Sequence, residues 1–503
     1  MTTHPMSPVD AAWFHMDGPA NLAMVTGVML TRERFDFDRV KAVYQQRILG
    51  FDRFRQRVVE RGFPVSSPHW EEMPNFDIGQ HIHHVALPAP HDQAALTTLL
   101  DDIASAPLDH EQPLWQVHVV DDVDGGSALI MRYHHCIGDG TAMMAVIEQL
   151  ADDAPESPPA TVAAEDPAAE EASGTVRVVP ALDAIGRQAA KALALAGSAV
   201  DAVAHPRELI DKAALLLQGT EMLVAELLRR PDPRSPFKGD FGLRKRVAWS
   251  SPVALDDVKA IGAFAGAKVN DVLVAGMTGA LRSYLRRRGV EVNETTVRAM
   301  VPVDLRPPDR VGKLGNEFGL VVLDLAVASP RRMDRLAKTK ERMDALKRSP
   351  EAAAMLALFN VFGRAPKAVE DFATWIFGSK ASVVMTNVVG PRTTLRLAGV
   401  PIERMMFWVP HPGRQLGMGI SILSYRGTAT LAVIADAHLL PDPEAITDQF
   451  NREFAAMLRQ VRAAAAKTPA AKPAARKAAA KAVARKPAVR PKAPRRPRSA
   501  AGR

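Results

Sequence analysis

His134-His135-Cys136-Ile137-Gly138-Asp139-Gly140 is the stretch of the chain that decides the fold, and it reads HHxxxDG. The apolar segment 127–133 leads into it as a buried strand does. Helical spacing follows in four apolar residues, Met143, Met144, Ile147 and Leu150. The pattern predicts a strand that ends at the second histidine, a tight Asp-Gly turn and a helix. An imidazole held there, at the mouth of a cleft, can take a proton from an alcohol or a thiol, although a histidine pair at a strand end also serves structural roles.

Length and composition limit the class of protein. The chain has 503 residues and is 47% apolar, which is enough for one very large or two ordinary domains with substantial cores. No run of eighteen apolar residues predicts a membrane-spanning helix, and the N-terminal residues do not resemble a secretory signal. The single cysteine, Cys136, excludes a disulfide within the chain and a multi-cysteine zinc site, which fits a reducing cytoplasm.

The net charge of +8 is unevenly distributed. Residues 462–503 hold 14 Lys and Arg and no Asp or Glu, so residues 1–461 hold 50 basic against 56 acidic residues. The globular part is therefore mildly acidic. The basic tail lacks the apolar residues needed to offset the entropy of ordering, and we expect it to be disordered.

The organisation follows from shifts in composition along the chain. We expect a mixed α/β domain over 1–150, a flexible acidic Ala/Pro linker over 151–182 and a helical connector over 183–239. A second α/β domain over 240–462 and the tail over 463–503 complete the chain. The connector fits two helices packed on the body, or an element that faces a membrane.

Several predicted elements follow from hydrophobic periodicity and turn residues. Strands are predicted at 21–30, 115–120, 128–133, 296–303, 318–327, 382–385, 416–423 and 428–434. Helices are predicted at 36–46, 256–265 and 271–287, and a last helix has Ile446, Phe450, Phe454, Met457 and Val461 on one face.

The HHxxxDG motif resembles the active-site signature of the acyl-CoA-dependent acyltransferases, the group of chloramphenicol acetyltransferase and the peptide-synthetase condensation domains. Further motifs match in order along the chain: Ser7-Pro8-Val9-Asp10, Trp13-Phe14, Met16-Asp17, Pro113-Leu114-Trp115, Val269-Asn270-Asp271-Val272, Val301-Pro302-Val303-Asp304-Leu305-Arg306, Gly315-Asn316 and Thr386-Asn387-Val388-Val389-Gly390-Pro391. Together they resemble the bacterial wax ester synthase/diacylglycerol acyltransferase family over roughly residues 5 to 460, with a gap near 155–235. The resemblance implies two chloramphenicol-acetyltransferase-like α/β domains of mixed sheets, with an active-site tunnel at their interface.

The resemblance also implies roles for the motif residues. His135 would be the general base that activates the acceptor alcohol toward an acyl-CoA, with no acyl-enzyme, no metal and no cofactor beyond the co-substrate. His134 would orient the strand end or hydrogen-bond the acceptor. Asp139 would pair structurally with an arginine, for which Arg306 is the candidate, and Gly140 would serve the turn and a close approach of substrate.

For most of the remaining candidate residues, two roles stay open. Asn270 fits the N-cap of the second-domain helix or an orienting contact to the acyl donor. Thr386 and Asn387 fit substrate or oxyanion contacts, with Thr386 where the family usually has serine. Trp115 fits packing at a strand start or a wall of the acyl channel. Cys136 occupies a variable position of the motif, and we expect it to be unreactive.

Substrates and partners follow from the resemblance. We expect long-chain acyl-CoA as donor and diacylglycerol as acceptor, with fatty alcohols giving wax esters as a side activity. The tail would bring the protein to an anionic membrane or lipid-droplet surface on the cytoplasmic side, although non-specific nucleic-acid binding or a merely solvated extension also fits its charge. Two alternatives stay open: acylation of a sugar or polyketide alcohol, and a non-catalytic lipid-droplet or nucleic-acid-binding protein.

Overall fold

The computed structural model describes residues 3–60, 68–154, 230–307, 310, 312–349, 351–352, 355–356, 378–411 and 415–467. Residues Met1–Leu458 form one compact unit, and Arg459–Arg503 form a second. Most of the predicted linker, nearly all of the helical connector and the tail beyond Lys467 lie outside the described residues, so those predictions stay predictions.

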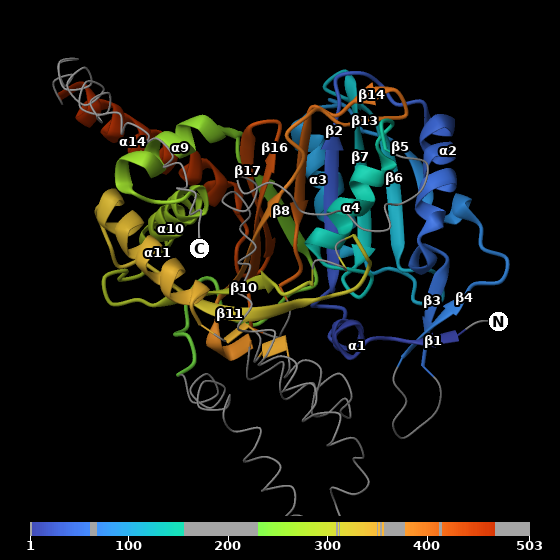
Figure 1. The fold of residues 1–503 in the computed structure, drawn as a ribbon, viewed down its shortest axis with the longest axis horizontal. Coiled ribbons are helices and arrows are strands. Elements are labelled where there is room, and N and C mark those ends of the chain that lie inside the picture. Colours follow the sequence, from blue (N-terminus) through green and yellow to red (C-terminus); the bar gives the residue numbers. More distant parts are fainter. Residues whose placement is uncertain are drawn as a thin grey trace, which may run out of the picture. The chain divides into compact units, whose positions relative to one another are not determined.

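A five-stranded sheet carries the N-terminal part of the fold (Figure 1). Its order is β15 (Arg404–Trp408), β2 (Met24–Leu30), β7 (Gly126–His134), β6 (Trp115–Val123) and β5 (Ile82–Ala86). Only β5 and β6 run parallel. The edge strand β15 comes from the C-terminal part of the chain and pairs antiparallel with β2, with Met406 opposite Val28. The sequence pattern had not indicated this strand.

Helices and short elements surround this sheet. The helices are α1 (Pro8–His15), α2 (Phe37–Arg47), α3 (Gln93–Ser105) and α4 (Gly140–Leu150), with short 3-10 turns η1 (Ile48–Gly50), η2 (Asp52–Phe54) and η3 (Ile78–Gln80). A small sheet has the order β1 (Thr3–Pro5), β4 (His69–Glu72) and β3 (Gln56–Val59). The helix α2 agrees with its prediction because Asp36 caps it through the N–H of Arg39 and Val40 faces the core.

A seven-stranded mixed sheet forms the C-terminal part. Its order is β11 (Phe318–Leu325), β10 (Val297–Asp304), β12 (Val383–Val389), β16 (Met418–Tyr425), β17 (Thr428–Asp436) and β8 (Lys245–Trp249), with β9 (Val253–Ala254) also on β17. The central strand β12 is parallel to both neighbours, and the other pairs are antiparallel. A separate two-stranded ribbon joins β13 (Arg396–Leu397) and β14 (Val400–Pro401).

Four described helices accompany this sheet: α9 (Leu255–Ala265), α10 (Val269–Arg287), α11 (Arg332–Lys347) and α14 (Glu444–Lys467). Nearly the whole of α10 is buried, and Phe450 and Met457 of α14 pack against it at Gly276. The helix α14 runs past the predicted end of the second domain at residue 462. The reason is its alanine run, residues 463–466, because alanine has the highest helix propensity.

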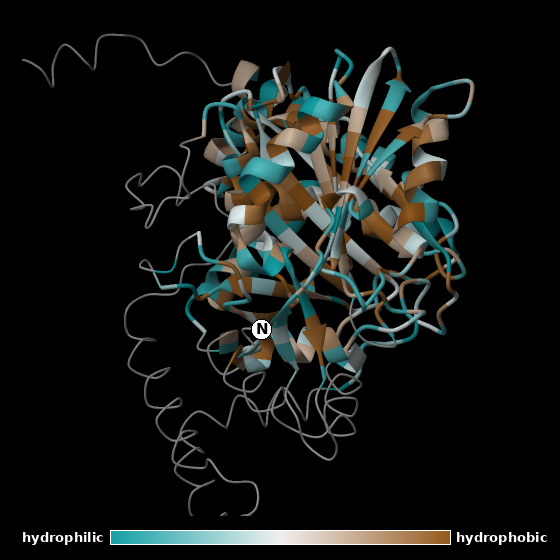
Figure 2. Cartoon of the chain, turned by 90° about the vertical axis from the view of Figure 1, so that its right-hand side faces the viewer, coloured by the Kyte–Doolittle hydropathy of each residue, from teal (hydrophilic) through white to brown (hydrophobic). Residues whose placement is uncertain are grey.

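The core joins the two halves of unit Met1–Leu458. One cluster of buried side chains includes Trp13, Val25 and Trp115 together with Met300 and Val384 of the seven-stranded sheet. Figure 2 shows apolar, brown-coloured strands in the interior and hydrophilic, teal-coloured residues on many outer loops. The predicted mixed α/β class with two sheets is confirmed.

Membrane spans were sought among the described residues. No single helix there is long and apolar enough to cross a membrane. The bent pair Leu255–Ala265 and Val269–Arg287 meets the criteria of length and composition only when its two helices are taken together.

Candidate active site

The HHxxxDG turn is fixed by backbone hydrogen bonds to both halves of the chain. The strand β7 ends at His134, one residue before the predicted end, and the N–H of His135 donates to the carbonyl of Ala23 at 2.7 Å. The turn then pairs with Gly315: the N–H of Gly315 donates to Ile137 O at 3.1 Å, and the N–H of Asp139 donates to Gly315 O at 3.3 Å. A segment 180 residues downstream therefore holds the turn that carries the histidine.

The imidazole of His135 is held in one orientation. Its ring stacks on Trp13, with centroids 3.9 Å apart and planes at 13°. Its Nδ1 lies 3.0 Å from Oδ1 of Asn316. The Nδ2 of Asn316 donates to two acceptors, Asp10 Oδ1 and the carbonyl of His135, both at 2.8 Å. The Asn316 Oδ1 is therefore the acceptor, so Nδ1 of His135 carries the proton and Nε2 keeps the lone pair that a general base needs.

Asp10 fixes Asn316 in turn. Its side chain is fully buried at the start of α1, and Oδ1 also accepts the backbone N–H of Asn316 at 3.0 Å. Its Oδ2 accepts from Arg53 at 3.0 Å, and Arg53 also donates to the carbonyls of Cys136 and Ile137. Hydrogen bonds from Arg53 through Asp10 and Asn316 to His135 thus link η2, α1 and the segment before β11 to the motif.

The electrostatic environment keeps His135 neutral. Burial lowers the pKa of His135 to about 4, against a weaker opposing effect of Asp139. At neutral pH the imidazole is therefore uncharged and able to accept a proton.

Asp139 bonds residues other than the histidine through both of its carboxylate oxygens, and one of them caps α4. Its Oδ1 accepts the N–H of Ala142 at 3.0 Å, and its Oδ2 accepts from Arg306 at 2.6 Å and from the N–H of Glu317 at 3.1 Å. The structure thus brings Asp139 and Arg306 together as a buried ion pair. Gly140 follows at the start of α4, where a Cβ atom would lie only 3.2 Å from Val388.

Two cavities meet at this turn. The first has about 750 Å³ of empty space, open solvent at its mouth included, and His135, Trp13, Asp304 and Thr386 are among its lining residues. The second encloses about 710 Å³ and is almost wholly apolar. Five residues line both cavities: Val25, Tyr133, Gly140, Val388 and Phe407. Because the walls are shared, the second cavity extends the first away from the histidine.

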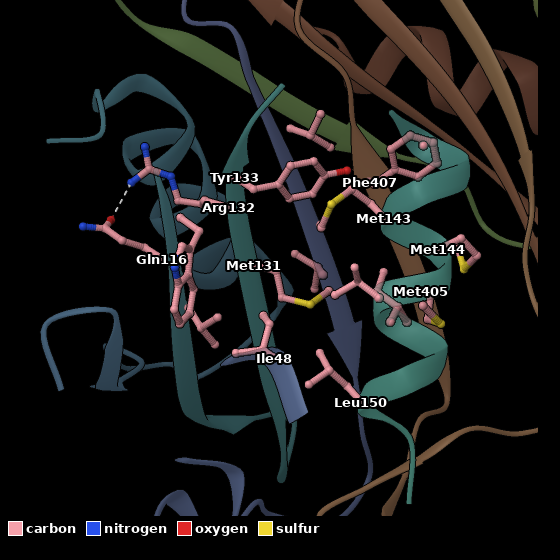
Figure 3. Close-up of a pocket in the computed structure, with 18 of the residues that line it drawn as sticks. Ile48, Gln116, Met131, Arg132, Tyr133, Met143, Met144, Leu150, Met405 and Phe407 are labelled. Atoms are coloured by element: carbon pink, nitrogen blue, oxygen red, sulfur yellow. Dashed lines mark hydrogen bonds between the residues drawn. The ribbon is translucent and has the colours of Figure 1, made fainter. Parts of the chain in front are cut away.

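Figure 3 shows the second cavity, which we call the apolar channel. Tyr133 and Phe407 lie toward one end and Leu150 toward the other, with methionines of three elements between them. Trp115 lines this channel as well and is buried, and its Nε1 donates to the carbonyl of Phe54 at 2.9 Å. Both roles considered for Trp115, packing and channel wall, are thus compatible with its position.

The C-terminal candidates separate into two groups. Thr386 lines the first cavity with His135. Asn387, the next residue of β12, donates to Asn270 at 2.9 Å, and neither asparagine lines either cavity. The strand β12 continues through Val389 and does not end at Met385, so adjacent side chains point to opposite faces.

Asn270 also differs from its predicted role as N-cap. The helix α10 begins at Val269 after Lys268, whose N–H is satisfied by the carboxylate of Asp271 at 2.9 Å. Asp271, the third residue of the helix, bonds the N–H of the N-cap residue Lys268, so the helix begins before Asn270. The side chain of Asn270 is therefore free to bond Asn387.

His134 lies behind the active turn. It is fully buried, its Nδ1 accepts the N–H of Cys136 at 3.1 Å, and its Nε2 lies 3.9 Å from Asp17. Burial lowers the pKa of His134 to about 4, and it lines neither cavity. Cys136 is also fully buried, and burial raises the pKa of its thiol, which opposes thiolate formation.

The sequence alone indicates no role for Trp13, Asp10 or Asn316, although all three stand in motifs that carry the family resemblance. They lie 122 to 181 residues from His135 in the sequence, and such separations give no local signal of contact. Among the described residues, no group of three or more His, Cys, Asp or Glu side chains is placed to hold a metal ion.

Comparisons with known proteins match the family that the sequence motifs resemble. A model of the wax ester synthase/diacylglycerol acyltransferase catalytic domain matches residues 6–273, and one of the WS/DGAT C-terminal domain matches residues 314–458. A Mycobacterium tuberculosis H37Rv protein named as a probable diacylglycerol O-acyltransferase is 26% identical over 405 residues, covering 79% of this chain and 82% of its own. Another M. tuberculosis relative with a diacylglycerol O-acyltransferase name is 27% identical over 449 residues, covering 86% and 87%.

Solved structures share the fold. The wax ester synthase/diacylglycerol acyltransferase of Marinobacter aquaeolei VT8 has a TM-score of 0.61 at 19% identity, covering 91% of this chain and 99% of its own. The first condensation domain of the calcium-dependent antibiotic synthetase reaches 0.56 at 15% identity, covering 92% and 96%. The predicted fold and family resemblance are confirmed: the chain is an acyltransferase that belongs to the wax ester synthase/diacylglycerol acyltransferase family.

Proposed function

We propose that this protein transfers the acyl group of a long-chain acyl-CoA to diacylglycerol, forming triacylglycerol, and to long-chain alcohols as a side activity. The observation that carries the proposal is the free Nε2 of His135 in the first cavity, fixed by the bond between Nδ1 and Asn316. The names of the mycobacterial relatives favour diacylglycerol as the acceptor.

The reaction follows from one base and one cavity. Nε2 of His135 takes the proton of the acceptor hydroxyl while its oxygen attacks the thioester carbonyl. The tetrahedral intermediate then expels CoA as the carbon–sulfur bond breaks, and the imidazolium returns the proton to the departing thiolate. The histidine is regenerated, so the step needs neither an acyl-enzyme nor a cofactor. His134 and the Asp139–Arg306 pair position the turn in this proposal.

Thr386 is suited to stabilise the oxyanion of that intermediate. Within the part of the chain that the structure describes, its hydroxyl makes no hydrogen bond, and its residue lines the cavity beside His135. A hydroxyl donor aimed at developing negative charge in a dry cavity is a common device of acyl-transfer enzymes. Asn270 and Asn387 would support the strand that carries Thr386 from its other face.

The apolar channel is suited to hold the acyl chain. Five methionines, Met131, Met143, Met144, Met405 and Met406, are among its lining residues. Flexible methionine side chains adapt to ligands of different shape. A channel of this composition favours long hydrocarbon chains, whose transfer from water is worth about 0.8 kcal/mol per buried methylene.

The test is ester formation from labelled oleoyl-CoA with diacylglycerol and, separately, with hexadecanol. Replacing the base in His135→Ala should lower the rate about 10²- to 10⁴-fold. The matched control is His110→Ala, because His110 is half exposed and lines neither cavity. Absence of ester with both acceptors from folded wild-type protein would instead favour another alcohol, such as a sugar lipid, or a non-catalytic role.

We also propose that the basic tail holds the enzyme peripherally on the cytoplasmic face of the membrane or on lipid droplets. Residues 468–503 hold 12 Lys and Arg without an acidic residue. Each basic residue near an anionic leaflet contributes about 1 kcal/mol. Deleting 468–503 should abolish binding to phosphatidylserine vesicles and leave turnover of detergent-dispersed substrate intact. Binding of the full chain to DNA and not to these vesicles would overturn the proposal.

A further inference from the structure

One polar group of the first cavity has no part in the proposed reaction: the carboxylate of Asp304. It stands at the end of β10, is half buried and lines the cavity with His135. The ionisable or hydroxyl side chains among the lining residues are few: His135, Asp139, Thr141, Asp304, Thr386 and Tyr133. Of the two carboxylates, Asp139 has both oxygens occupied by Ala142, Arg306 and Glu317.

Asp304 retains unused acceptor capacity. Its Oδ1 accepts the backbone N–H of Arg306 at 2.9 Å, and among the described residues its Oδ2 accepts only the hydroxyl of Thr141, at a long 3.3 Å. An ionised carboxylate accepts about four hydrogen bonds. The nearby guanidinium of Arg306 is committed to Asp139 and to the carbonyls of Lys313 and Gly315, so it forms no direct bond to Asp304.

The apolar surroundings of Asp304 make unsatisfied hydrogen-bond acceptors on its carboxylate energetically unfavourable. Burial raises the pKa of Asp304, with the Asp139 charge acting in the same direction and the hydrogen bonds of Arg306 and Thr141 opposing it. Apolar neighbours such as Met300, Phe318 and Val384 line the same cavity. A ligand that donates a hydrogen bond at this position offsets the desolvation of the carboxylate.

We propose that Asp304 and Thr141 form a second hydroxyl-binding subsite in the acceptor pocket, which selects acceptors that carry a free hydroxyl beside the one that is acylated. The proposal rests on the proposed function. A carboxylate recognises donors only, and the ester oxygens of diacylglycerol donate nothing. Hexadecanol has one hydroxyl, which His135 requires. A monoacylglycerol or another lipid with two hydroxyls satisfies both sites. The subsite therefore adds diol lipids to the acceptors of the proposed function and favours them over acceptors with a single hydroxyl, diacylglycerol and fatty alcohols alike.

The size of the preference follows from the chemistry of the contact. A hydrogen bond to a charged acceptor changes affinity or rate about tenfold to a hundredfold. We therefore expect kcat/KM for 1-monooleoylglycerol to exceed that for hexadecanol by a factor in that range. An active site built to bond a substrate hydroxyl discriminates against the analogue that lacks it because its own polar group is left unpaired.

The experiment compares kcat/KM for 1-monooleoylglycerol, diacylglycerol and hexadecanol in wild type, Asp304→Asn and Thr141→Val. Both substitutions keep side-chain size, and each should reduce the ratio of the monooleoylglycerol value to the hexadecanol value about tenfold or more. The matched control is Glu317→Gln, which removes a neighbouring carboxylate that does not line the cavity and should keep the wild-type ratio.

A parallel measurement separates this subsite from the proposed function. Calorimetry measures binding of 1-O-hexadecylglycerol, which has two hydroxyls, and of hexadecanol to the wild type and to Asp304→Asn. Preferential binding of the diol, lost in the variant, supports the subsite even if wild type forms no ester, which would refute the function alone. A preference for the diol that is unchanged in Asp304→Asn overturns the subsite.

The amide N–H groups of the pantetheine arm of CoA offer the same donor chemistry. If they occupy Asp304, Asp304→Asn raises the KM for acyl-CoA equally with all three acceptors and leaves the acceptor ratio unchanged. That result would also overturn the proposal.

Discussion

Replacing Asn316 by leucine tests whether this residue sets the protonation form of the base. Leucine has a similar size and no hydrogen-bonding group. The substitution removes three bonds at once: to Nδ1 of His135, to the carbonyl of His135 and to Asp10 Oδ1, at 3.0, 2.8 and 2.8 Å. Asp10 Oδ1 keeps the backbone N–H of residue 316, and the histidine ring keeps its stack on Trp13.

The magnitudes follow from those contacts. Leaving a buried polar group unpaired lowers the free energy of unfolding by about 1–3 kcal/mol. For catalysis, losing one neutral hydrogen bond that favours the Nδ1–H form costs about 0.5–1.5 kcal/mol, a rate loss of roughly 2- to 13-fold. This is well below the loss of about 10²- to 10⁴-fold expected for His135→Ala, because the ring remains in place.

The decisive assay is a double-mutant cycle, with release of CoA from oleoyl-CoA as the readout. If Asn316 acts through the imidazole, Asn316→Leu causes no further rate loss in the His135→Ala background. The matched control is Asn270→Leu, another buried asparagine, which bonds Asn387 and not the histidine. Its rate effect should be the same in both backgrounds. Equal effects of Asn316→Leu with and without His135 would refute the orienting role.

Four further predictions follow from the same geometry. Because the pKa of His135 lies at about 4, kcat/KM should stay level from pH 8 to about 5 and fall only near pH 4; a fall centred near 6.5 in a pH–rate profile would contradict this. The buried His134 and His135 each have a pKa of about 4, against 6.5 in the unfolded chain, so the unfolded state binds protons at a higher pH than the folded state. Urea titration should therefore show the free energy of unfolding falling as the pH drops from 6.5 to 4, by up to about 3 kcal/mol per histidine. Arg306→Gln leaves Asp139 buried without its cation and should cost about 3–5 kcal/mol of unfolding free energy, whereas a shift below 1 kcal/mol would show that the pair is not needed. Ile147→Trp should fill the apolar channel and shift acyl-CoA preference to shorter chains, while Ala145→Trp on the same helix, outside the channel, should not.

Local signals in the sequence were sufficient for several elements. The strand, turn and helix around HHxxxDG, the helix α10 and the hairpin of β16 and β17 each depend on periodicity and turn residues within about twenty positions. The edge strand β15 was not predicted because its partner β2 lies nearly 380 residues earlier. The family resemblance implied a substrate contact for Asn387, but the strand was predicted to end at Met385, and the pleat of the longer β12 turns Asn387 to the face opposite Thr386.

In the candidate site too, local sequence predicts some features, and contacts between distant segments determine the others. His135 and its neutral form follow from the motif and its burial, but the group that orients it does not, because Asn316 and Asp10 lie 181 residues after and 125 residues before it. Hydrogen bonding between such distant segments depends on the packing of the two sheets. A single sequence records the residue types but not their contact.

The dependence of the base on the downstream segment has a mechanistic consequence. The turn residues Ile137 and Asp139 bond Gly315, the Asp139 carboxylate bonds Arg306, and Nδ1 of His135 bonds Asn316. All three partners lie within residues 306–316, which join β10 to β11. Asp304 and Phe318, which flank this connection, line the first cavity, and the connection orients the base that works there. A substitution that loosens this connection should therefore lower kcat through misorientation of His135 even where every cavity-lining side chain is kept, because a base is effective only within hydrogen-bonding reach and alignment of its proton donor.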